Sequence, residues 1–105
     1  MKRGEVRWYK FLKPDKNRPV VILTRDSAID FLGEITVAPI TSTIRDIPTE
    51  VLLSKYQDGM PQDCVVNVDH VQTVSKSKIG SMITSLNRRK MQELRAALLF
   101  AFGFQ

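Results

Sequence analysis

Apolar and polar residues alternate along the first part of the chain in the way that short β-strands require. In Glu5–Phe11, Val6 and Trp8 fall on one face and polar residues fall on the other. Pro19–Thr24 is almost continuously apolar and β-branched, which predicts a strand buried on both faces. Further short runs predict strands at Glu34–Ile40, Thr49–Leu53, Cys64–Asn67, Val71–Val74 and Lys78–Ile83.

Polar segments separate these runs and predict loops and turns. Leu12–Asn17 and Thr41–Pro48 are predicted loops, and Asp58-Gly59 marks a turn. Ser27–Leu32 suits one helical turn, with Asp26 or Ser27 as its cap and Gly33 as its stop.

The end of the chain changes to a helical period. Apolar residues recur at helical spacing from Asn87 onward, at Met91, Leu94, Leu98 and Ala101. Thr84 or Ser85 is the expected N-cap and Gly103 the expected stop. Short strands followed by one amphipathic helix predict a mainly β (α+β) domain, with the strands closed into a small barrel or a strongly bent sheet.

Composition narrows the class of protein. A chain of 105 residues predicts one domain, 1–105, and its longest apolar run is too short to span a membrane. The first residues lack the apolar stretch of a signal peptide, and a single cysteine suits a reducing compartment, so we expect a cytoplasmic protein. The core residues that we expect are Trp8, Val20, Ile22, Val37, Leu52 and Cys64.

The net charge of +5 is unevenly distributed. Residues 1–25 carry +6, residues 26–75 carry −6 and residues 76–105 carry +5. A polarised surface of this kind attracts a phosphate backbone or an acidic peptide, although a solvated face without a partner explains the charge equally well. Arg88, Arg89 and Lys90 stand at the positive end of the predicted helix, so they serve an external partner or only solubility.

The residue types present favour chemistry that needs little machinery. One histidine, one cysteine and no carboxylate cluster argue against a metal site, and no nucleophile or phosphate-loop motif is present. RNA carries its own nucleophile, the 2′-hydroxyl. An arginine, a hydroxyl group and one carboxylate or imidazole are therefore sufficient to cleave it without metal or cofactor.

An ordered set of motifs along almost the whole chain resembles the MazF/PemK family of bacterial toxins. The motifs are Arg3-Gly4-Glu5-Val6-x-Trp8, Asn17-Arg18-Pro19-Val20-Val21-Ile22-Leu23-Thr24, Val37-Ala38-Pro39-Ile40-Thr41-Ser42, Pro48-x-Glu50-Val51-Leu52-Leu53, Asp63 through Val74, and Ile79-Gly80. The resemblance implies an SH3-like barrel that acts as a homodimer. It implies metal-independent cleavage of single-stranded mRNA at a short sequence, leaving a 2′,3′-cyclic phosphate or 3′-phosphate and a 5′-hydroxyl.

The resemblance also implies partners. An antitoxin of the MazE kind would place an acidic C-terminal peptide in the RNA groove, and operator DNA would be bound only through the antitoxin complex. Neither a membrane nor a cofactor is implied.

The resemblance assigns roles to single residues. Arg18 matches the active-site arginine and Thr41 the threonine of the Pro-x-Thr segment, although alone each reads equally well as a strand-end residue. Asp69 matches an aspartate assigned as a base in the PemK branch, with an Asx turn as the alternative. His70 replaces the usual glutamine. Asn67 replaces an arginine of that branch, which favours a site built on Arg18 and Thr41 over one that pairs the aspartate with an arginine. The base stays open between Asp69, His70 and Arg18.

Other residues are candidates for RNA contact. Ser42 and Thr43 extend the polar cluster, and the expected contacts with RNA are made by Lys10, Lys13, Lys16, Asn17, Ser42, Thr43 and Asn67. The lysines read equally well as loop residues that keep the chain soluble. Trp8 can stack a base, but we expect it in the core.

Two other functions compete with RNA cleavage. A CcdB-like gyrase poison shares the fold and depends on an aromatic-Gly-aliphatic C-terminal end, which Phe102-Gly103-Phe104 resembles only weakly. A small barrel that binds nucleic acid without cutting it is the other alternative.

Overall fold

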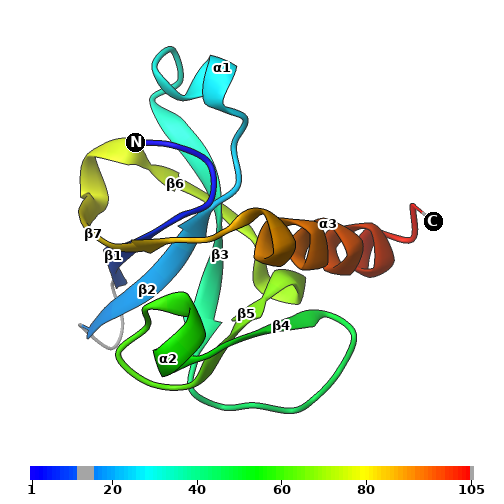
Figure 1. Cartoon of the computed structure of the whole chain (residues 1–105). Coiled ribbons are helices and arrows are strands. Elements are labelled where there is room, and N and C mark those ends of the chain that lie inside the picture. Colours follow the sequence, from blue (N-terminus) through cyan, green and yellow to red (C-terminus); the bar gives the residue numbers. More distant parts are fainter. Residues whose placement is uncertain (12–15, 105) are drawn as a thin grey trace.

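The computed structural model describes residues 1–11 and 16–104 (Figure 1). One bent antiparallel sheet carries a long C-terminal helix that projects to one side (Figure 1). The elements in chain order are β1 Glu5–Phe11, β2 Lys16–Ile22, α1 Asp26–Ile29, β3 Glu34–Thr41, β4 Glu50–Leu53, α2 Lys55–Asp58, β5 Cys64–Asn67, the 3-10 turn η1 Val68–His70, β6 Gln72–Ser75, the 3-10 turn η2 Lys76–Lys78, β7 Ile79–Ser85 and α3 Arg88–Phe102.

The strand order is β4-β5-β3-β2-β1-β7, and β6 pairs with β3 beside this path. β3 is therefore shared: Glu34 to Val37 pair with β6, whereas Ile40 and Thr41 pair with β5. This splitting bends the sheet into a half-barrel. The predicted mainly β fold with a C-terminal helix is confirmed.

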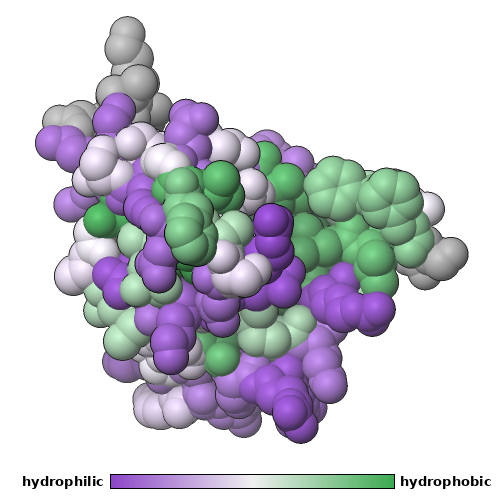
Figure 2. Space-filling view, turned by 90° about the horizontal axis from the view of Figure 1, so that it is seen from above, coloured by the Kyte–Doolittle hydropathy of each residue, from purple (hydrophilic) through white to green (hydrophobic). Residues whose placement is uncertain are grey.

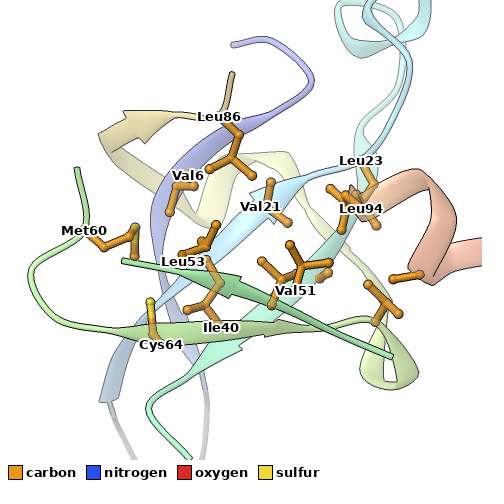
Figure 3. Packing of buried hydrophobic residues seen from close by; sticks show 14 residues of the cluster. Val6, Val21, Leu23, Ile40, Val51, Leu53, Met60, Cys64, Leu86 and Leu94 are labelled. Atoms are coloured by element: carbon orange, nitrogen blue, oxygen red, sulfur yellow. The ribbon is translucent and has the colours of Figure 1, made fainter. Parts of the chain in front are cut away.

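Two apolar clusters lie on the two sides of β2. Val21 belongs to the larger cluster, and Val20 and Ile22 belong to the smaller one, so the run is buried on both faces as predicted. The larger cluster joins the sheet to Leu94 and Ala97 of α3 (Figure 3). Burying these side chains supplies the main stabilisation of a domain of this size.

Several local predictions are wrong. β2 begins at Lys16, so Lys16 and Asn17 are in a strand and not in a loop, while Leu12 to Asp15 lie outside the described residues. Leu52 is 52% exposed because it points away from the core, unlike its neighbours Val51 and Leu53.

The expected helix caps also differ. α1 starts after Arg25, and its cap makes no side-chain hydrogen bond; Asp26 instead accepts a bond from the Arg3 backbone N–H. The helix ends at Ile29, well before Gly33.

α3 is capped by Asn87, whose side chain accepts from the Lys90 N–H, because β7 continues through Ser85 and leaves neither Thr84 nor Ser85 at the helix start. The stop at Gly103 is confirmed, with φ of 74°.

The cationic start of α3 has an internal use that the sequence did not indicate. Lys90 Nζ donates to the Leu52 carbonyl at 2.7 Å and lies 3.6 Å from the Glu93 carboxylate. Arg89 lies 3.8 Å from the same carboxylate. Lys90 therefore ties the helix to β4 rather than serving an external partner.

Within residues 1–11 and 16–104, no helix has the length and apolar character that crossing a membrane requires.

Candidate active site

The register between β2 and β3 brings Arg18 and Thr41 together. Val20 is opposite Pro39, Val21 is opposite Ala38 and Ile22 is opposite Val37. Arg18 and Thr41 lie beyond the last of these pairs, at the same end of the two strands. Two residues that are far apart in the sequence are thus brought to one end of the strand pair.

Both side chains line a hollow that we call the main cleft, with a volume of about 330 Å³. Its lining includes Trp8, Asn17, Arg18, Thr41, Ser42, Gln62 and Cys64. Arg18 is exposed, and its side chain has no hydrogen bond or ion pair within the described residues. Its guanidinium can therefore form two parallel hydrogen bonds with a phosphate.

The Thr41 hydroxyl is oriented by its own loop. Thr41 Oγ1 accepts a hydrogen bond from the Thr43 backbone N–H at 3.2 Å. This bond uses one of the two lone pairs of the oxygen and leaves the hydroxyl proton to be donated to a ligand oxygen. Thr43 itself is exposed and does not line the main cleft, so its contribution is made through its backbone.

Cys64 lies behind this surface, with 3% of its surface exposed. Burial, helped by the negative charges of Asp63 and Asp58, raises the pKa of the Cys64 thiol to about 11. The thiol is neutral near pH 7 and is no nucleophile there, in agreement with its expected role as a small core residue.

Asp69 and His70 lie elsewhere. They belong to η1, which packs against α3, and neither lines the main cleft. Asp69 Oδ2 accepts a hydrogen bond of 2.6 Å from Thr49 Oγ1. His70 is exposed and has no side-chain hydrogen bond within the described chain.

The amide of Asn67 is used by the fold. Asn67 is 8% exposed, and its Oδ1 accepts from the Asp69 backbone N–H at 3.1 Å. This bond forms an Asx-type turn in which Asn67, and not Asp69 as in the alternative interpretation, supplies the acceptor. The RNA contact of Asn67 stays a prediction, for a side chain whose Oδ1 is already used within the fold.

The other residues predicted to contact RNA separate into three groups. Asn17 lines the main cleft and also a neighbouring hollow, the side cleft, which Lys10 lines as well. Lys16 starts β2, but its side chain is not described, and Lys13 lies outside the described residues.

Sequence reasoning missed the residues that the α2–β5 loop brings to the main cleft. Met60, Pro61 and Gln62 line it, although they stand more than 40 residues from Arg18. Trp8 lines it too and is half-buried, so its expected place in the core is wrong. The only signal for the loop was the turn at Asp58-Gly59.

No group of three or more histidine, cysteine or acidic side chains suited to hold a metal ion gathers anywhere in residues 1–11 and 16–104. The lining of the main cleft in this part of the chain also holds no carboxylate and no imidazole. Its chemistry is therefore that of hydrogen-bond donors and one fixed positive charge.

Comparison with known proteins agrees with this description. Residues 2–102 match the family model described as PemK-like, MazF-like toxin of type II toxin-antitoxin system. A probable endoribonuclease MazF2 of Mycobacterium tuberculosis is 36% identical over 103 residues, which cover 98% of this chain and 99% of the relative. The same organism provides a similar solved structure, toxin MazF-mt6, at 35% identity and a TM-score of 0.85, covering 94% and 96% of the two chains.

A mycobacterial endoribonuclease solved in complex with its cognate antitoxin shares the fold at a TM-score of 0.89 and 24% identity, covering 100% of this chain and 97% of that one. None of these findings supports the gyrase-poison alternative. The match over residues 2–102, taken with the placement of Arg18 and Thr41 at one end of the β2–β3 pair, shows that the chain belongs to the family of PemK-like, MazF-like toxins of type II toxin–antitoxin systems.

Proposed function

We propose that this toxin is a metal-independent endoribonuclease that cuts single-stranded mRNA at the main cleft. The observation that carries the proposal is the juxtaposition of Arg18 and Thr41 beside Ser42 in one hollow. The relatives named as endoribonucleases support the class of activity.

The reaction needs only one displacement at phosphorus. The 2′-oxygen of the substrate attacks the neighbouring phosphorus, the bond from phosphorus to the 5′-oxygen breaks, and a 2′,3′-cyclic phosphate forms. The 2′-hydroxyl loses a proton and the leaving 5′-oxygen gains one, so the second product carries a 5′-hydroxyl.

Arg18 and Thr41 act on the charge that builds up on phosphate during this step. The Arg18 guanidinium pairs with the non-bridging oxygens, and the Thr41 hydroxyl donates to one of them. Donors fixed in advance stabilise the transition state more than the ground state when they point to the place where charge develops. Ser42 and Asn17 line the same hollow, which supports a role for them in holding neighbouring phosphate or sugar oxygens.

The described residues that line the main cleft include no carboxylate and no imidazole, and an arginine side chain stays protonated in proteins. We propose that solvent removes the 2′-proton and that Asp69 or His70 takes part only where a second copy of the chain brings it to the cleft. The single-turnover rate should then rise roughly tenfold per pH unit from pH 5 to 8. A rate that levels off within this range would show that a side chain, and not solvent, removes the 2′-proton.

The partners are proposed from the family and from the surface. A homodimer is expected, and Figure 2 shows a hydrophobic patch over the outer part of α3, beside a groove of about 470 Å³ lined by Met91, Leu98 and Phe102. We propose that a second copy covers this patch, since apolar surface of this extent is typical of interfaces. The molar mass in solution tests this.

An antitoxin peptide of acidic character is the proposed inhibitor of the main cleft, and operator DNA would be bound through that complex. The relative solved with its cognate antitoxin supports an assembly of this kind. A bound peptide should protect Arg18 from arginine-specific reagents.

The decisive experiment uses the purified chain and a mixed single-stranded RNA in EDTA. The expected result is fragments that carry 5′-hydroxyl ends. Mapping these 5′ ends also gives the recognition sequence. Full-length RNA that persists over a broad panel of sequences overturns the proposal, and binding without cutting establishes the plain nucleic-acid-binding alternative.

A further inference from the structure

Trp8 lies where the main cleft meets the side cleft. The indole is half-buried and lines both hollows, and it belongs to neither apolar cluster of the described chain. Lys78 and Gly80 line the side cleft together with Trp8. A chain that has a phosphate at Arg18 and continues toward Lys78 therefore passes over Trp8.

A bulge in β7 opens the space beside Trp8. Arg7 is opposite Met82 and Tyr9 is opposite Ile79, so two residues of β7 face the single residue Trp8 of β1. Such bulges redirect side chains and are frequent next to active sites. The redirection explains why Trp8 leaves the core although it shares the period of Val6.

The bulge is fixed by side-chain contacts. Arg7 Nη1 donates to the Gly80 carbonyl at 3.0 Å, and Arg7 Nε donates to Glu5 Oε1 at 2.8 Å. Gly80 itself adds no side chain to the hollow; a Cβ there would lie 3.7 Å from the Trp8 Cβ. The indole is thus left open on the side of the side cleft.

Gln62 approaches the main cleft from the α2–β5 loop, which the fold holds firmly. Asp58 Oδ2 accepts from the Ser54 N–H at 2.8 Å, and Asp63 Oδ1 accepts from the Lys55 N–H at 3.0 Å. Both carboxylates are thereby used to close the loop on itself, one on each side of Gln62.

Gly59 sets the direction of this loop. Its φ of 74° is in the left-handed region, and a Cβ would lie 2.8 Å from Thr84 Oγ1 of β7. Only glycine satisfies both constraints without strain. The loop is therefore packed directly on the sheet, and Gln62 reaches the cleft from a fixed position.

These placements combine a flat aromatic ring, a neutral amide and flanking positive charges. Aromatic rings stack any nucleobase, while an amide offers one donor and one acceptor that match the edges of particular bases. We infer that Trp8 stacks the nucleobase next to the phosphate held by Arg18 and that Gln62 reads the edge of that base. The inference rests on the proposed function and names the part of the substrate that determines where it is cut.

Trp8 reports on its own role, because it is the single tryptophan of the chain. The probe is a single-stranded DNA of ten nucleotides in random sequence, which lacks the 2′-hydroxyl and stays uncut. Titration should quench the tryptophan emission to a saturating level. Emission that stays unchanged while a labelled strand is bound overturns the stacking role.

The binding of a labelled DNA strand to variants tests stacking on Trp8 without relying on tryptophan fluorescence. Trp8→Leu should weaken binding of the labelled strand by roughly 5- to 150-fold, and Trp8→Phe should restore most of it. Tyr56→Leu removes an aromatic side chain that is 92% exposed on α2 and lines neither cleft, so its binding should equal that of the unmodified chain. Thermal unfolding verifies that each variant folds, and equal binding by Trp8→Leu and Tyr56→Leu contradicts the inference.

Gln62→Leu tests the reading of the base edge. The variant should cut RNA but lose roughly 5- to 150-fold of its preference between the favoured base and the other three, measured from mapped 5′ ends. Gln57→Leu, at an exposed glutamine of α2, is the matched control and should cut at the unmodified positions. The same cutting positions for Gln62→Leu and Gln57→Leu overturn the reading role.

The two proposals fail in different ways. Saturable quenching of Trp8 without any cutting of RNA refutes the nuclease and supports the stacking subsite. Cutting of RNA without quenching, and without altered positions in Gln62→Leu, supports the nuclease and refutes the subsite.

Discussion

The main cleft and the η1 turn hold the same kinds of polar side chain but use them in opposite ways. Thr41 Oγ1 accepts a bond from a backbone N–H and keeps its proton for a ligand. Thr49 Oγ1, 20 residues before Asp69 in the chain, donates its proton to Asp69 at 2.6 Å and is almost fully buried. A hydroxyl proton that is used inside the protein stabilises the fold, and one that is kept can bind substrate.

The contrast extends to the charged residues. Arg18 has no partner within residues 1–11 and 16–104, whereas the Asp69 carboxylate is held by Thr49. Glu50, near η1, also closes its own loop by accepting from the backbone N–H groups of Arg45 and Asp46. The acidic middle of the chain is thus largely used to fix loops, and the cleft is left with donors.

The largest expected effect separates Arg18 from Asp69 and His70. Arg18→Ala should lower the single-turnover rate of RNA cleavage by roughly 10²- to 10³-fold, because it removes the fixed charge that faces the phosphate. Asp69→Asn and His70→Ala should each stay within about threefold, because neither residue lines the cleft. A loss at Asp69 as large as that at Arg18 would remove the contrast between the regions.

The next effect concerns the single thiol behind the cleft. With a pKa of about 11 rather than 9, Cys64 has roughly 100-fold less thiolate at neutral pH. Alkylation by iodoacetamide at pH 7.5 should be slower than that of a cysteine peptide by at least this factor, as followed by mass spectrometry. Alkylation at the rate of the cysteine peptide would show that the Cys64 thiol is exposed to solvent.

The two threonines give the most direct comparison. Thr41→Val should lower cleavage by roughly 10- to 50-fold and leave thermal stability nearly unchanged, since a hydrogen bond to a charged group is lost only in the complex. Thr49→Val should leave cleavage nearly unchanged and lower the free energy of unfolding by about 1–3 kcal/mol, because Asp69 loses its donor. If the two variants exchange these effects, the assignment of the regions is wrong.

The smallest effect is expected at acidic pH. Burial raises the pKa of Glu5, but the hydrogen bond and charge of Arg7 outweigh it, so the pKa lies below its ordinary value. The contribution of Glu5 to stability is therefore complete above its unfolded pKa of about 4.5 and is lost as the pH falls through the lower folded value. Glu5→Gln should reduce the loss of unfolding free energy at acidic pH by at most about 1 kcal/mol, as measured by denaturant unfolding at a series of pH values.

The sequence determined the local elements because strand and helix periods depend on neighbouring residues. The buried run at Val20 to Ile22, the strand from Glu34 and the helix that stops at Gly103 follow from spacing alone. The motifs around Arg18 and Thr41 also indicate the family without any geometry, in agreement with the family match over residues 2–102.

Only the tertiary structure decided which residues meet. The pairing of β2 with β3 brings Arg18 and Thr41 to one end of the strand pair, where both line the main cleft. The β7 bulge turns Trp8 from the core to the cleft, and the packing of Gly59 on Thr84 fixes the loop that places Gln62 there. Each of these depends on contacts between segments distant in the chain, so no local pattern encodes them. Asp69 shows the converse: its motif matched, but the short η1 turn and the bond from Thr49 direct it away from the cleft.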